Sequence, residues 1–144
     1  PMRIPSLAAA ATLLFAAAMT GGCVPKPKQS YTTDQVKQIE SLEELMRGQA
    51  QTADPQFNKI GQSSYTPADY AGMADAARRL QATSETLRTR HSQNRPPSFL
   101  TYAARLNEQA GELLAAAESK DVTKSSEALV GIRETCRTCH KEHR

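Results

Sequence analysis

The residues best suited to chemistry lie together near the carboxyl end of the chain. Cys136, Cys139 and His140 form the pattern Cys-x-x-Cys-His, which is the attachment signature of a c-type haem. Two thiols can add across the two vinyl groups of protohaem, and their spacing places both on one side of a helical turn. His140 follows at once, so its imidazole can bind the iron from the same side. The pattern predicts one covalent haem c, with Cys136 and Cys139 as thioether donors and His140 as the proximal iron ligand.

Three other interpretations of the cysteine pair stay open at this point. A zinc site needs four ligands, and only His91 and His143 could join the set. A disulfide between Cys136 and Cys139 would suit an oxidising compartment. A redox Cys-x-x-Cys normally opens a helix after a strand, where the thiol pKa is lowered. Here the pair falls late in a predicted helix, so we favour haem.

Helices are the elements that must position these residues. The apolar residues are mostly Ala and Leu, Trp is absent, and no segment alternates as a strand does. The first helix is predicted to begin near Thr32, which forms a capping-box pattern with Gln35, and to weaken near Gly48. Its apolar stripe comprises Val36, Ile39, Leu42, Leu45 and Met46. Residues 51–65 are predicted to be a loop.

Three further helices are predicted after that loop. The second begins at Thr66 with Pro67 in its first turn, follows a heptad seam to His91, and is ended by Pro96 and Pro97. The third begins at Ser98, and Asp121 or Thr123 caps the fourth. Because short connections favour antiparallel neighbours, we expect residues 32–144 to form an all-α, up-and-down antiparallel four-helix bundle with a C-terminal haem-attachment helix.

The chain resembles the cytochrome c′ and cytochrome c-556 family, most closely over residues 98–144. The resemblance rests on the Cys-x-x-Cys-His motif in the last helix, the preceding Leu113-Leu114-Ala115-Ala116-Ala117 run, and the short connection between them. After the motif histidine, the family commonly has two variable residues, then Tyr or Phe, and then Arg. Here His143 replaces the aromatic residue, whereas Arg144 keeps its place, which makes Arg144 a candidate for contact with a haem propionate.

The family divides at the sixth position of the iron. The resemblance implies either a methionine there, for which Met46 is the candidate, or an open site covered by an apolar side chain such as Leu42. Thioether ligation suits a one-electron carrier, and an open site suits binding or sensing of a small gas such as nitric oxide. Met46 could also be ordinary core filler.

The other methionine, tyrosine and histidine residues of the helices have less specific predictions. Met73 is assigned to the bundle core, Tyr102 to packing, and His91 to a partly exposed helix end. His143 has two interpretations, a hydrogen bond to a haem propionate or exposure to solvent.

The amino terminus predicts export. Residues 1–22 have the charged and apolar regions of a signal peptide, and small residues before Cys23 resemble a bacterial lipobox. We expect residues 23–31 to be a lipidated Cys23 and a Pro/Lys-rich tether. An ordinary cleaved signal, with Cys23 incidental, is the alternative. The expected location is the periplasm, with lipid as the sole membrane anchor.

Composition and motifs exclude other functions. The net charge of +3 gives no case for nucleic-acid binding. No catalytic triad, phosphate loop or paired-carboxylate motif points to an enzyme. The expected partners are redox proteins of the cell envelope, and the resemblance adds a homodimer. A structural lipoprotein without haem is the remaining alternative.

Overall fold

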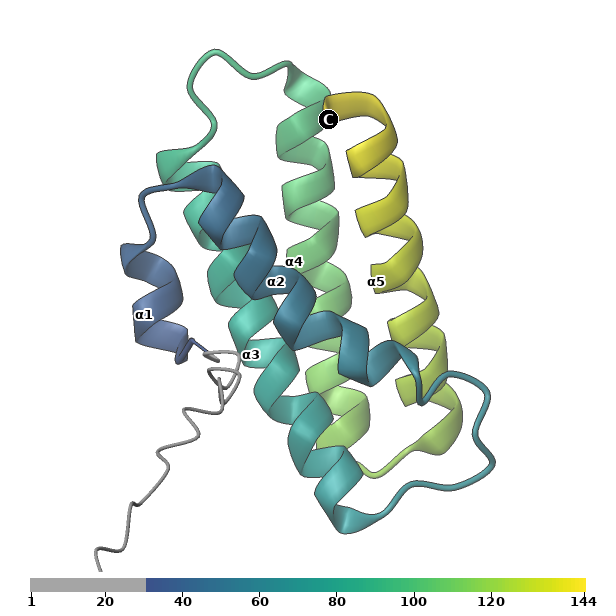
Figure 1. The fold of residues 1–144 in the computed structure, drawn as a ribbon. Coiled ribbons are helices and arrows are strands. Elements are labelled where there is room, and N and C mark those ends of the chain that lie inside the picture. Colours follow the sequence, from purple (N-terminus) through teal and green to yellow (C-terminus); the bar gives the residue numbers. More distant parts are fainter. Residues whose placement is uncertain (1–30) are drawn as a thin grey trace, which may run out of the picture.

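The computed structural model describes residues 31–144, which fold into an antiparallel helical bundle (Figure 1). The helices are α1 (Thr33–Gln38), α2 (Leu42–Phe57), α3 (Pro67–Arg90), α4 (Pro97–Glu118) and α5 (Val122–His143). The predicted all-α four-helix bundle is confirmed in α2–α5, and α1 is an additional short helix that packs against α3. No helix in residues 31–144 is long and apolar enough to cross a bilayer. The predicted signal segment 1–22 and Cys23 lie outside the described residues, as does the tether except Tyr31.

The first predicted helix is interrupted, which corrects the sequence prediction. Ile39 has extended backbone angles and ends α1, and the Ser41 side chain accepts a hydrogen bond from the Glu44 amide to begin α2. The interruption lets Val36 and Ile39 bury against the same cluster as Leu45. Ser41 and Glu44 form a capping pattern inside the apolar stripe, and that signal was available in the sequence.

The predicted loop over residues 51–65 is wrong in its first half, because α2 continues to Phe57. Pro55 lies in the last turn of the helix, where its missing N–H removes a single backbone hydrogen bond. Ala53 is 3% exposed and Phe57 packs against the main core. Burial of these side chains therefore outweighs the local preference of the Asp-Pro pair for a turn.

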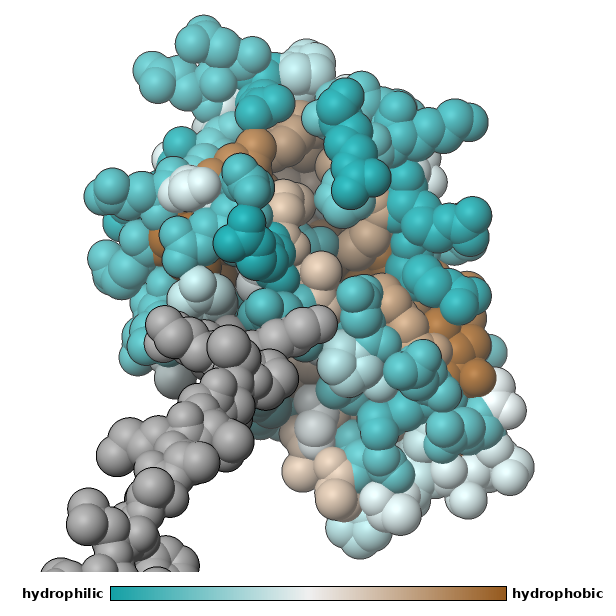
Figure 2. Space-filling view, in the orientation of Figure 1, coloured by the Kyte–Doolittle hydropathy of each residue, from teal (hydrophilic) through white to brown (hydrophobic). Residues whose placement is uncertain are grey.

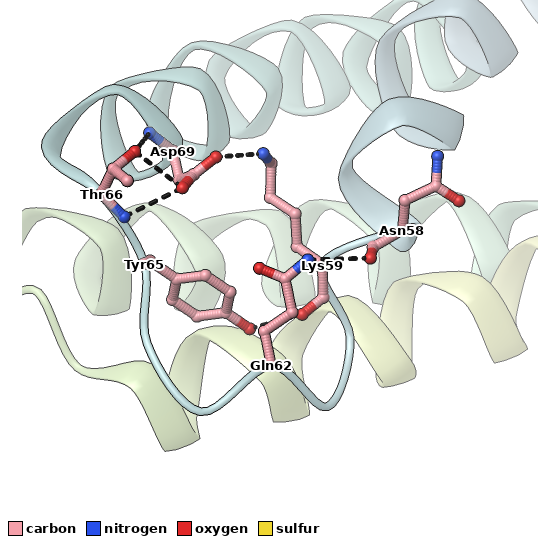
Figure 3. Close-up of polar contacts among 6 residues, drawn as sticks. All are labelled: Asn58, Lys59, Gln62, Tyr65, Thr66 and Asp69. Carbon is pink, nitrogen blue, oxygen red and sulfur yellow. Dashed lines mark hydrogen bonds and ion pairs between the residues drawn. The ribbon is translucent and has the colours of Figure 1, made fainter.

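The remaining turn between α2 and α3 is held by a polar cluster (Figure 3). The Thr66 backbone donates to Asp69 Oδ2 at 2.9 Å, and the Asp69 amide donates to Thr66 Oγ1 at 3.2 Å, which confirms the predicted cap. Lys59 donates to the other carboxylate oxygen, and Tyr65 donates to the Lys59 carbonyl at 2.9 Å. The hydrogen bonds from Lys59 and Thr66 hold the pKa of Asp69 well below its usual range.

The core is a layer of small and branched side chains between α3, α4 and α5. Met73, Leu80, Leu113 and Ile132 are at most 1% exposed, and the prediction that Met73 belongs to the core is confirmed. Ser84, the polar break in the predicted seam, is also fully buried, and its hydroxyl donates to the Ala103 carbonyl of α4. Ser84 therefore fastens α3 to α4 without leaving an unpaired polar group.

Helix α3 ends at Arg90 with His91 as its C-cap, so the predicted position of His91 at a partly exposed helix end is confirmed. Pro96 and Pro97 do not end the helix themselves, because a connection over residues 91–96 separates them from it. Asn94 takes a positive φ of 60° in this connection, a conformation that Asn tolerates better than most residues. Helix α4 begins at Pro97, and Asp121 caps α5 through a 2.9 Å hydrogen bond from the Lys124 amide.

Candidate haem site

Helix α5 brings the three motif side chains to one side of the bundle. Cys136, Cys139 and His140 line a single narrow pocket, and the facing residues from α3 and α4 are apolar or aromatic: Leu87, Phe99, Tyr102, Ala103 and Leu106. This arrangement matches what a flat macrocycle bonded through two sulfurs and one imidazole requires of a helix. The tertiary fold therefore adds an apolar surround to the three donors that the sequence singled out.

A second cavity continues from the same side chains into a groove between α2 and α5. Its volume is about 350 Å³. The residues that line it from α2 include Met46, Gln49, Ala53 and Phe57. Those that line it from α5 are Arg133, Cys136, Arg137, His140 and Arg144. Helices α2 and α5 pack against each other less closely than the other adjacent pairs of the bundle. Figure 2 shows apolar surface in a hollow between hydrophilic side chains in the region where Figure 1 has these two helices. The looser α2–α5 contact therefore leaves open space beside the motif side chains.

Both motif cysteines are free thiols rather than a disulfide. Burial raises the pKa of Cys136 to about 11, and a hydrogen bond from Gln49 Nε2, 3.2 Å from its sulfur, offsets part of that effect. Burial also raises the pKa of Cys139. A redox dithiol needs the opposite shift, toward the thiolate. The electrostatics therefore argue against the thiol–disulfide interpretation of the motif.

The zinc interpretation finds no support in the ligand geometry. Over residues 31–144, no three His, Cys, Asp or Glu side chains converge in the way a metal-ion site requires. His91 caps α3, and its Nε2 is buried without a hydrogen-bond partner. His143 faces α4 instead of the thiols.

The register of α5 is set by a polar contact just before the motif. Thr135 donates to Gln109 Oε1 on α4 at 2.8 Å, and Thr135 is 5% exposed. One turn earlier, a Cβ at Gly131 would lie 2.8 Å from Gln109 Nε2, so glycine leaves room for that amide. Because Cys136 directly follows Thr135, this contact fixes the direction in which the first thiol points.

His143 is packed on α4, which corrects the interpretation that it is exposed to solvent. Its side chain is 11% exposed. The Nε2 atom lies 3.1 Å from Ser98 Oγ, and the ring makes edge-to-face contacts with Phe99 and Tyr102 at centroid distances of 5.8 Å and 5.9 Å. The Tyr102 hydroxyl also donates to Glu142 at 2.6 Å. These contacts fasten the last turn of α5, next to His140.

Cations line the α5 side of the groove, and Asp54 lines its α2 side. Arg144, the predicted propionate contact, lines the groove together with Arg133 and Arg137, two residues that the sequence analysis did not single out. Arg137 carries an ion pair with Glu134 at 3.8 Å, and Arg133 has a buried Nε without a partner. Guanidinium groups in this position suit the two carboxylates of a haem.

Of the two predicted sixth-position residues, Met46 lies on the opposite wall and Leu42 does not. Met46 is half-buried and lines both cavities, whereas Leu42 packs with it against the cluster around Leu45 and Phe99 without lining either one. Gln49, one turn beyond Met46, is 8% exposed and was missed by sequence reasoning. The sequence did carry a signal for Gln49. The apolar stripe of Leu42, Leu45 and Met46 continues to position 49, where a polar residue replaces the expected apolar one.

Together, the bundle, its motif in the last helix and the apolar groove define the class of c-type haem proteins built on four helices. The donor set fits a haem, since two free thiols and an imidazole face one apolar pocket, and guanidinium groups line the adjoining groove. The family model described as Cytochrome C' matches residues 26–144, and the chain belongs to the cytochrome c′ family. Searches of curated proteins and of solved structures gave no significant match.

Family membership settles the coarse identity of the molecule. It is a c-type haem cytochrome, and its cofactor is covalently bound haem c. Proteins of this family are generally periplasmic, and they are generally electron carriers or gas-binding proteins instead of enzymes.

Proposed function

We propose that the chain is an exported monohaem cytochrome that transfers one electron through haem c. Cys136 and Cys139 would hold the haem as thioethers, and His140 would be the proximal iron ligand. The observation that carries this proposal is the convergence of these three side chains on one apolar pocket, across which Met46 lies on a facing helix. The bound haem supplies the one-electron iron couple.

The chain's own residues orient the haem and exclude water from it. Leu87, Phe99 and Leu106 provide an apolar wall, which favours a higher reduction potential by disfavouring the more highly charged oxidised iron. The hydrogen bond between Thr135 and Gln109, together with the His143 contacts, limits motion of α5 on either side of the motif. A rigid site lets the iron change charge with little rearrangement.

The sixth ligand in this proposal is Met46. Its helix faces α5 across the groove, so a haem held from α5 would have Met46 on the side of α2. Thioether ligation from that face gives a low-spin site suited to electron transfer.

Binding of a small gas at a five-coordinate iron is the second candidate function. One observation favours it: Gln49 places a polar amide beside Met46 in the groove, where a carrier with two protein ligands needs none. The reduced absorption spectrum decides between the two functions. Sharp, low-spin α and β bands support Met46 ligation, and broad high-spin bands support the open site.

Location and partners complete the proposal. A lipid on Cys23 would tether the bundle to the periplasmic face of a membrane, and redox proteins of the envelope would exchange electrons with it, with a homodimer as a further assembly. The lipobox-like Gly21-Gly22-Cys23 sequence supports the anchor. A Cys23→Ser variant should move from the membrane fraction to the soluble periplasmic fraction. Equal membrane retention of the variant would refute lipid anchoring.

A further inference from the structure

The groove between α2 and α5 contains one buried amide that the fold leaves incompletely paired. Gln49 is 8% exposed, and its Nε2 donates to Cys136 Sγ at 3.2 Å, while its Oε1 has no partner among the described residues. Sulfur is a weak acceptor. The amide nitrogen carries two N–H donors, and its one partner among the described residues is this weak acceptor, so Gln49 can donate to a ligand in the groove.

The position of Gln49 identifies where that partner lies. Met46 and Gln49 are three residues apart on α2, and both line the two cavities that also contain Cys136 and His140. Since the haem is proposed to be bonded from α5, its other face would be turned toward α2. The amide would therefore lie on the side of the haem where a sixth ligand binds, in a wall that also contains Met46, Ala50, Ala53, Asp54 and Phe57.

We infer that Gln49 determines which small ligands the sixth position accepts, by hydrogen bonding to the bound ligand. This inference rests on the proposed function, because it requires haem attached through the motif. An all-apolar wall discriminates mainly by size, whereas a hydrogen-bond donor favours ligands that carry negative charge on the atom away from the iron. Gln49 thus selects for small, polar or anionic diatomic ligands that displace Met46 or enter beside it.

The test uses mature holoprotein whose haem content is verified by intact mass. The parent for the comparison is Met46→Ala, which opens the sixth position, and Gln49→Leu is introduced into it. Carbon monoxide on the ferrous protein and cyanide on the ferric protein are the probes. Gln51→Leu is the matched control, because Gln51 lies on the same helix two residues later and lines neither cavity. Gln49→Glu is a second variant that keeps the side-chain size but removes the donor.

Loss of one hydrogen bond of about 1.4 kcal/mol predicts that Gln49→Leu raises the cyanide dissociation constant about tenfold. The carbon–oxygen stretching frequency of the carbon monoxide complex should also rise, because a donor near the ligand oxygen weakens that bond. Gln49→Glu should weaken cyanide binding as well, and Gln51→Leu should leave both measurements at the parent values.

Two results would overturn the inference. One is a Gln49→Leu protein with the parent's cyanide affinity and stretching frequency. The other is failure of carbon monoxide and cyanide to bind the fully loaded parent, since Gln49 would then face no ligand. A mature wild-type protein without covalent haem is a different result, which refutes the proposed function itself.

Discussion

Replacing His143 tests whether the end of α5 is fastened as the structure shows. His143→Ala removes a hydrogen-bonded contact with Ser98 and edge-to-face contacts with Phe99 and Tyr102. A neutral hydrogen bond contributes about 1 kcal/mol, and each aromatic pair adds roughly 0.5–1.5 kcal/mol. The expected loss in the free energy of unfolding is therefore about 2–4 kcal/mol, or a fall in the melting temperature of roughly 10–15 °C for a domain of this size.

Two further variants separate the contributions. His143→Phe keeps an aromatic ring and loses only the contact with Ser98, so it should cost about 1 kcal/mol, as should Ser98→Ala. The double variant Ser98→Ala/His143→Phe should cost no more than either single change, because both remove the same bond.

Thermal and urea unfolding of the holoprotein, followed by circular dichroism, measure these differences. Lys141→Ala is the control, because Lys141 is exposed in the same turn and should change stability by less than about 0.5 kcal/mol. If His143→Ala is as stable as Lys141→Ala, the packing of the last turn of α5 does not hold the site and the reasoning is wrong.

Three more predictions concern the groove and the α2–α3 turn. Met46→Ala should shift the reduced absorption spectrum toward high spin, and an unchanged spectrum would remove Met46 from the iron. Because the folded pKa of Asp69 lies below its unfolded value, its stabilising effect is full above about pH 4 and is lost as the pH falls below that value. The free energy of unfolding, measured with urea between pH 2 and 7, should therefore fall less at acid pH for Asp69→Asn than for Asp34→Asn. An equal fall in the two variants would contradict this. In haem-free folded chain, Cys136 should alkylate about a hundredfold more slowly at pH 8 than a thiol of pKa 9, given its pKa of about 11; reaction at the rate of an ordinary thiol would show that Cys136 is not buried.

Local signals predicted the helix starts well. Thr32, Thr66 and Asp121 cap helices as expected, because a capping side chain bonds to backbone within three residues and needs nothing from the rest of the fold. The break at Ser41 uses the same local chemistry, but the apolar stripe running across it masked the signal.

The extension of α2 to Phe57 was not predictable in this way. It depends on burial of Ala53 and Phe57 against helices that follow much later in the chain, and the Asp-Pro pair alone favours a turn. Such a preference yields when tertiary contacts bury enough apolar area.

Residues of the candidate site also differ in whether local sequence or tertiary packing places them. Cys136, Cys139 and His140 form one contiguous motif, so their types and spacing predicted them directly. Gln49 meets Cys136 across 87 positions of sequence, and its place in the groove follows only from α2 lying against α5. The packing of His143 on α4 is likewise a contact between distant segments.

The mass of the mature protein tests the central claim most directly. Intact-mass spectrometry of material made in a host with haem-attachment machinery should show the processed chain plus one haem, and replacing both Cys136 and Cys139 with Ser should remove that addition. A mature wild-type chain with no mass beyond its residues and any acyl groups would contradict the account.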